Sequence, residues 1–159
     1  MEKRSYFQSK HLNRWPTSSE IDLYLLSSHQ RQGSFASGID GGNLVAEGLY
    51  GTESLEPLTG RVDVYLYYVI NPHHGFYFQY TKWDGRISRN DTYNSKGDLK
   101  RLKEFVRSLS GTPLSLDLFV PFEWGGRALK EFIESGGELP KSIAWIPNGD
   151  LPPEAFPLP

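Results

Sequence analysis

The four histidines are the first residues to examine for metal binding or acid–base chemistry. They are His11, His29, His73 and His74. Neither His-x-x-His nor His-Glu-x-x-His occurs, and these are the spacings that place two imidazoles on one metal ion. His73 and His74 are adjacent, so their side chains would point to opposite sides of an extended backbone. They follow Asn71-Pro72 in a predicted turn, where exposed polar residues are common. We therefore expect no metal site and no bound cofactor.

Nucleophilic and phosphate-binding chemistry also lack their usual sequence patterns. No Gly-x-Ser-x-Gly occurs, and residues 33–38 space their serines differently. Residues 38–42, Gly-Ile-Asp-Gly-Gly, lack the Gly-Lys-Thr ending of a P-loop and the third glycine of a dinucleotide fingerprint. Glu53 and Glu56 are close along the chain but suit a turn equally well. No complete catalytic set can be assembled, so we expect a protein that is not an enzyme.

Composition limits the class of protein further. The chain has 159 residues, of which 38% are hydrophobic, 14% aromatic and 23% charged, values that suit one folded domain over residues 1–159. A net charge of -2 argues against direct nucleic-acid binding. The absence of cysteine excludes disulfides and suits a reducing compartment. No apolar run resembles a signal peptide or a transmembrane span. We expect a cytoplasmic protein that does not bind membranes.

Local patterns predict the elements of the first half. Residues 1–16 are polar and are expected to form an extended lead-in. Thr17 and Glu20 have the spacing of a capping box, which begins a short helix that ends before Gly33. Residues 33–43 are expected to be a loop, 44–50 a strand and 52–60 a turn. Three antiparallel strands should follow, over 62–70, 76–83 and 86–93, because these segments are rich in β-branched and aromatic residues around turn signals.

The second half alternates helical and extended patterns. Apolar residues from Leu99 to Leu109 lie at helical spacing, and Gly111 to Pro113 would end that helix. Residues 114–120 are expected to be a strand that stops at Pro121. A second amphipathic helix through Ala128 and Phe132 should close at Gly136-Gly137. A short strand is predicted at 142–146, followed by a proline-rich tail, 147–159, without regular structure.

These elements together predict an α+β fold. Because the strands come mainly before the helices, we expect one antiparallel sheet of five to six strands, with two to three helices mainly on one face. Asp84-Gly85 is a hairpin dipeptide, so Trp83, Asp84 and Arg86 are expected at a hairpin tip. Trp and Arg are residue types enriched in protein interfaces. Packing of Trp83 against a helix explains the pattern equally well.

The segment 120–145 resembles immunity protein family 1 of bacterial polymorphic toxin systems. The matching positions are Pro121, Glu123, Ala128, Phe132, Gly136, Pro140 and Trp145. The same residues have a physical interpretation as scaffold, because they begin, pack and end a helix and place a large side chain in the core. Gly125 and Gly126 depart from this interpretation, since glycine weakens the first turn of a helix.

The resemblance implies an immunity protein, an inhibitor that takes part in interbacterial competition. Such a protein binds a cognate toxin domain, blocks its active site and protects the producing cell. Because many toxin domains have basic clefts, an acidic patch on the inhibitor would favour association. The candidate partner-binding residues are Glu53, Glu56, Trp83, Asp84, Arg86 and Asp91. The alternatives are a small-ligand or adaptor-binding module and, as a weaker one, a small hydrolase.

Overall fold

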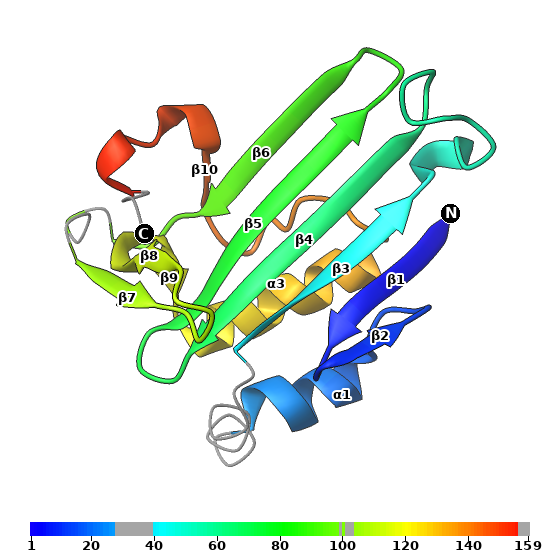
Figure 1. Ribbon diagram of the computed structural model, residues 1–159. Helices are drawn as coiled ribbons and strands as arrows, with labels where there is room; N and C mark the ends of the chain where they lie inside the picture. The colour runs from blue at the N-terminus through cyan, green and yellow to red at the C-terminus, as the bar shows by residue number, and fades with distance from the viewer. Residues whose placement is uncertain (28–39, 99, 101–103, 156–159) are drawn as a thin grey trace.

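A computed structural model describes residues 1–27, 40–98, 100 and 104–155. Its main layer is an antiparallel sheet of eight strands, with the neighbour order β10-β6-β5-β4-β3-β1-β2 and β9 paired to β5 (Figure 1). The strands of this sheet are β1 (Glu2–Phe7), β2 (Lys10–Leu12), β3 (Gly41–Glu47), β4 (Val62–Asn71), β5 (Gly75–Asp84), β6 (Arg89–Ser95), β9 (Phe119–Val120) and β10 (Trp145–Pro147). The α+β class is confirmed, and the strand count is higher than predicted.

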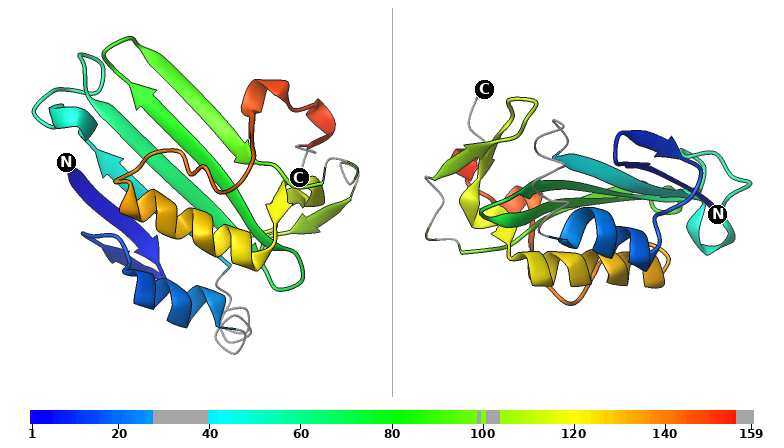
Figure 2. Two further views of the ribbon diagram at one scale, coloured as in Figure 1. Left: turned by 180° about the vertical axis from the view of Figure 1, so that it is seen from behind. Right: turned by 90° about the horizontal axis from the view of Figure 1, so that it is seen from below.

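The helices of the described residues cover one face of this sheet. Helix α1 (Ser18–Ile21) continues into the π-helical turn η1 (Asp22–Leu26), and α3 (Phe122–Glu134) lies beside them on the same face (Figure 2). The core lies between these helices and the sheet. It includes Leu66, Phe78 and Phe132, which are all almost fully buried. The prediction of helices mainly on one face is therefore confirmed for the described residues.

The capping box forms as predicted. The Glu20 amide donates to Thr17 Oγ1 at 3.2 Å, and the Thr17 amide donates to Glu20 Oε1 at 3.0 Å. Ile21 and Leu25 then face the core. Residues 28–39 lie outside the described residues, so the predicted end of this helix and most of the predicted loop 33–43 lie there too.

The prediction of an extended lead-in over residues 1–16 is wrong, because residues 2–7 and 10–12 are strands of the sheet. Strand β1 pairs with β3, with Ser5 opposite Leu44, although their polar sequence gives little sign of a strand. Alternation explains the pairing, since Ser5 and Phe7 are buried and the residues between and before them are more exposed. Strand β3 also begins earlier than predicted, at Gly41, and ends at Glu47.

A second sheet of two strands, β7 (Phe105–Arg107) and β8 (Pro113–Ser115), lies on the face opposite the helices (Figure 2). The helix predicted from Leu99 to Leu109 is wrong at residues 105–107, and residues 99 and 101–103 lie outside the described part. Gly111, expected to end a helix, instead lies in the turn that joins the two strands, with φ of 91°. Pairing with β8 in a local hairpin has overridden the helical pattern here.

The predicted strand 114–120 is interrupted by the 3-10 turn η4 (Leu116–Leu118). The interruption lets β8 pair with β7 while β9 pairs with β5, at Phe76 opposite Val120. The final strand, predicted at 142–146, is β10, three residues long. The tail contains two further 3-10 turns, η5 (Asn148–Asp150) and η6 (Pro153–Ala155), so its described part is not wholly irregular. Phe156 and Leu158 lie outside the described residues.

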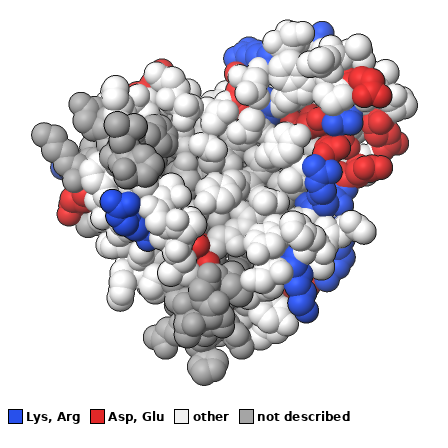
Figure 3. Space-filling view, in the orientation of Figure 1, with Lys and Arg blue, Asp and Glu red and all other residues white. Residues whose placement is uncertain are grey.

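The central part of the other face of the sheet, not covered by β7 and β8, carries few charges. Tyr65 and Tyr67 are partly exposed there, beside Gln79 and Thr81 of the neighbouring strand. In the space-filling view this central area is uncharged, and charged side chains lie mainly toward its edges (Figure 3). Within the described residues, no helix is long and apolar enough to cross a membrane.

Candidate functional site

One end of the sheet brings together two segments that are distant in sequence. The β3–β4 connection, residues 48–61, meets the β5–β6 turn with its flanking strand ends, residues 82–91 (Figure 1). We call this surface the loop end. Trp83 Nε1 donates a hydrogen bond to the Pro57 carbonyl oxygen at 2.5 Å, and the Gly85 amide donates to the Arg61 carbonyl oxygen at 3.0 Å. These two contacts fix the segments against each other.

The β3–β4 connection is itself held in one shape by its own hydrogen bonds. Thr52 Oγ1 donates to the Leu49 carbonyl oxygen at 2.7 Å and accepts from the Val62 amide at 2.9 Å. The Gly48 amide donates to Asp63 Oδ1 at 3.0 Å, and Gly48 has φ of 79°, a left-handed conformation that ends β3. The 3-10 turn η2 (Leu49–Gly51) follows directly. The connection is therefore a rigid platform for the side chains that it exposes.

All six residues that the sequence suggested for partner binding lie at the loop end. Glu53 and Glu56 are on the connection, Trp83 and Asp84 end β5, Arg86 is in the turn, and Asp91 is on β6. Trp83 is half-buried, and its indole holds Pro57, so it acts chiefly as a support. Trp83 does not belong to the buried core between the helices and the sheet, and its indole N–H donates to a loop carbonyl instead.

The acids of the loop end are largely neutralised. Asp84 is paired with Arg86, Asp91 with Arg89, and Glu53 with the terminal amine of Met1. The hydrogen bond from the Arg86 guanidinium, reinforced by its charge, lowers the pKa of Asp84 below its ordinary value. Acidic and basic side chains accordingly lie side by side in this region (Figure 3). The expectation of an acidic patch fits only Glu56, which has no ion pair with a described residue.

The sequence interpretation missed the apolar part of the loop end. Leu58 is 81% exposed and Ile87 63%, and Leu55 and Tyr50 are also exposed. The Arg86 guanidinium carbon lies 5.1 Å from the centroid of the Tyr50 ring. The Tyr50 hydroxyl donates to Glu138 Oε1. Leu55 and Leu58 in the predicted turn 52–60 could have indicated this apolar surface, because turns usually carry polar residues.

The residues that resemble the immunity family lie elsewhere, around α3. Ala128 and Phe132 face the core, and Pro121 and Glu123 are exposed at the start of the helix. Gly136 follows the helix with φ of 75°.

The Pro140 carbonyl oxygen accepts a hydrogen bond from Trp145 Nε1 at 2.7 Å, and the indole packs against Phe78 and Tyr80. These contacts are those expected of a scaffold. The motif thus lies in α3, in the segment that follows α3 and at the start of β10.

Gly125 and Gly126 lie inside α3, where helix propensity alone disfavours them. A Cβ at Gly125 would lie 2.4 Å from the Phe76 ring, so glycine lets the helix approach the sheet closely. Packing therefore explains the departure from a helix-favouring residue.

Within the described part of the chain, no group of three or more His, Asp or Glu side chains could hold a metal ion. His73 and His74 are in the β4–β5 turn, at the other end of the sheet from the loop end. They do not point apart as along an extended strand, since both line one cavity. Comparison with protein-family models and with curated protein sequences gives no match to this chain.

Proposed function

We propose that this protein is an immunity protein that binds a cognate bacterial toxin domain through the loop end and blocks the toxin's active site. The observation that carries the proposal is the exposure of Leu58 and Ile87 on two segments held together by hydrogen bonds. Large apolar side chains inside a rim of charges are the anatomy of a protein interface. Their rigid support lowers the entropy lost on binding.

The resemblance of residues 120–145 to the immunity family supports the same proposal. Its matched residues, such as Phe132 and Trp145, have contacts of the scaffold and leave the loop end free to differ between proteins that recognise different toxins. Inhibition takes place in the cytoplasm of the producing cell, where the toxin would otherwise act.

The charges of the loop end predict the character of the complex. Asp84 and Asp91 already have arginine partners, so the partner surface meets mixed charges around an apolar centre. Apolar burial by Leu58 and Ile87 then supplies most of the affinity, and association depends only modestly on salt.

The test uses the product of the gene directly upstream of the gene for this chain, which the proposal expects to be the toxin. The unaltered chain should co-purify with that protein and neutralise it. The double variant Leu58→Ser/Ile87→Ser should weaken binding at least about 100-fold, because interface hot spots commonly contribute about 2 kcal/mol or more each. Leu23→Ser is the matched control, since Leu23 is 52% exposed on η1, away from the loop end. Its affinity should stay within about threefold of the original.

Two outcomes would count against different parts of the proposal. Failure of the unaltered chain to bind or neutralise the neighbouring protein would reject the immunity function. Full neutralisation of the toxin by a folded Leu58→Ser/Ile87→Ser variant would be consistent with the immunity function but would reject the loop end as the binding surface.

A further inference from the structure

A cavity of about 570 Å³ lies at the end of the sheet opposite the loop end. Its walls come from the β4–β5 turn, the segment after β6, η4 and β9, the start of α3, and the segment before β10. Small-molecule sites commonly measure about 300–1,000 Å³ and lie where several elements converge. Neither the loop end nor the proposed inhibition uses this cavity.

Aromatic rings form much of its wall. The His74 ring lies 6.4 Å from the Phe119 ring and 6.4 Å from the His73 ring, measured between centroids. Trp124, in the first turn of α3, also lines the cavity and is 46% exposed, high for a side chain of this size. Aliphatic side chains of η4, β9 and the segment before β10 complete the wall. Such a lining favours a planar ring, which stacks on aromatic faces or meets their edges.

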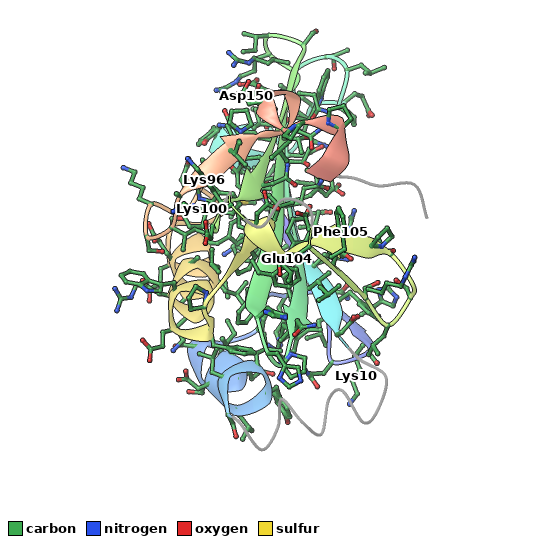
Figure 4. The ribbon with its side chains drawn as sticks, turned by 90° about the vertical axis from the view of Figure 1, so that its left-hand side faces the viewer. Lys10, Lys96, Lys100, Glu104, Phe105 and Asp150 are labelled. Carbon is green, nitrogen blue, oxygen red and sulfur yellow. The ribbon has the colours of Figure 1, made fainter. Side chains whose placement is uncertain are left out.

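Lys96 contributes a cationic group to the cavity. Its backbone amide donates to the Ala144 carbonyl oxygen at 3.0 Å, which fixes its position between the segments after β6 and before β10. Its ammonium group has no acidic partner among the described residues. Asp98 also lines the cavity, but its Oδ1 accepts a hydrogen bond from the Lys100 amide at 3.0 Å. Lys96 and Lys100 both belong to the stretch after β6 (Figure 4).

We propose that this cavity binds a small aromatic anion, a planar ring that carries a phosphate or carboxylate group. Trp124, Phe119 and the imidazoles contact the ring, and the Lys96 ammonium pairs with the anionic group. The Asp98 carboxylate repels a negative charge placed beside it, so the anionic group of the ligand lies against Lys96. The site is a binding site only, and the proposal stands apart from toxin inhibition.

The test is an NMR titration of the uniformly ¹⁵N-labelled full chain with phenyl phosphate and, separately, with benzoate. Saturable shifts should appear in the amides of residues 96–98, 119–120, 122–124 and 142–144. Phenol and inorganic phosphate are the matched partial ligands, and each should bind at least about tenfold more weakly than phenyl phosphate, because each lacks one of the two contacts. The stronger of phenyl phosphate and benzoate identifies which anionic group the site prefers.

Variants then separate the roles of the residues. Lys96→Met should weaken phenyl phosphate binding at least about tenfold, and Lys100→Met should leave it unchanged, because Lys100 does not line the cavity. Trp124→Ala should weaken phenyl phosphate more than inorganic phosphate. Three results would each overturn the proposal. They are phenyl phosphate binding by Lys96→Met as tight as by the original protein, phenol binding as tight as that of phenyl phosphate, and no shifts at the cavity residues at millimolar ligand. The unperturbed amide spectrum of each variant serves as the check on folding.

Discussion

The Trp83 indole donates its N–H to the Pro57 carbonyl oxygen across 26 positions of sequence, and this bond joins the end of β5 to the β3–β4 connection. The residue after Pro57 is Leu58, the most exposed large apolar side chain of the described residues. The position of Leu58, a proposed binding residue, therefore depends on the half-buried Trp83.

We expect Trp83→Phe to destabilise the protein by about 1–2 kcal/mol, since it removes this donor and part of a packed ring. Urea denaturation measures the change. Trp124→Phe is the matched control, because Trp124 is 46% exposed, donates no hydrogen bond to a described residue, and keeps an aromatic ring under Arg127 when it is replaced by Phe. Its free energy of unfolding should change by no more than about 0.5 kcal/mol. Equal destabilisation by both variants would show that the bond to Pro57 contributes nothing particular.

If the proposed toxin is the partner, the Trp83→Phe variant should also bind it more weakly than its loss of stability explains. The β3–β4 connection loses a tether, so ordering Leu58 in the complex costs more entropy. Calorimetric titration under conditions where both proteins are fully folded checks this. Unchanged affinity would mean that the internal hydrogen bonds of the connection, such as those of Thr52, are sufficient to hold it.

Gly125→Ala should lower stability by about 1–2 kcal/mol, although alanine is the better helix former by about 1 kcal/mol. The new methyl group would overlap the Phe76 ring, and overpacking a core commonly costs about 1–3 kcal/mol. Gly149→Ala is the control, because nothing lies within 4 Å of the corresponding Cβ position. Thermal unfolding compares the two. A Gly125→Ala variant that is more stable than the original would show that the helix can move away from the sheet freely.

The capping box of α1 predicts a dependence of stability on pH. Hydrogen bonds from Arg14 and from the Thr17 amide lower the pKa of Glu20 from 4.5 to about 2 in the folded protein. A carboxyl with a lowered pKa stabilises the fold above its unfolded pKa and loses this contribution as the pH falls toward the folded value. The original should therefore be more stable than Glu20→Gln at pH 7, and the difference should shrink between about pH 4.5 and pH 2.

Urea denaturation of both proteins at several pH values measures this difference. A Glu20→Gln difference that stays constant down to pH 2 would contradict the assignment.

Elements with a local cause could be predicted from the sequence. The Thr17–Glu20 capping box, the three central strands and α3 each follow from residues within one segment, because caps, turns and hydrophobic periodicity act over a few positions. The presence of the β5–β6 turn followed from Asp84-Gly85 in the same way. The turn spans residues 85–88, so β6 begins at Arg89, three residues later than predicted. The proposed site was found in part for this reason, since Trp83, Asp84 and Arg86 occupy that turn or its edges.

The rest was decided by which segments pair or meet in the folded chain. Strand β1 is polar along most of its length, and it is a strand because β3, about 40 residues later, offers it a partner. Phe105 lies at a helical spacing but pairs opposite Ser115. The segments that carry Leu58 and Ile87 are brought to the same end of the sheet by bonds such as that from Trp83 to Pro57. Sequence patterns report the preference of each segment, whereas strand pairing and loop contacts depend on which other surface is present, and that is a property of the tertiary structure alone.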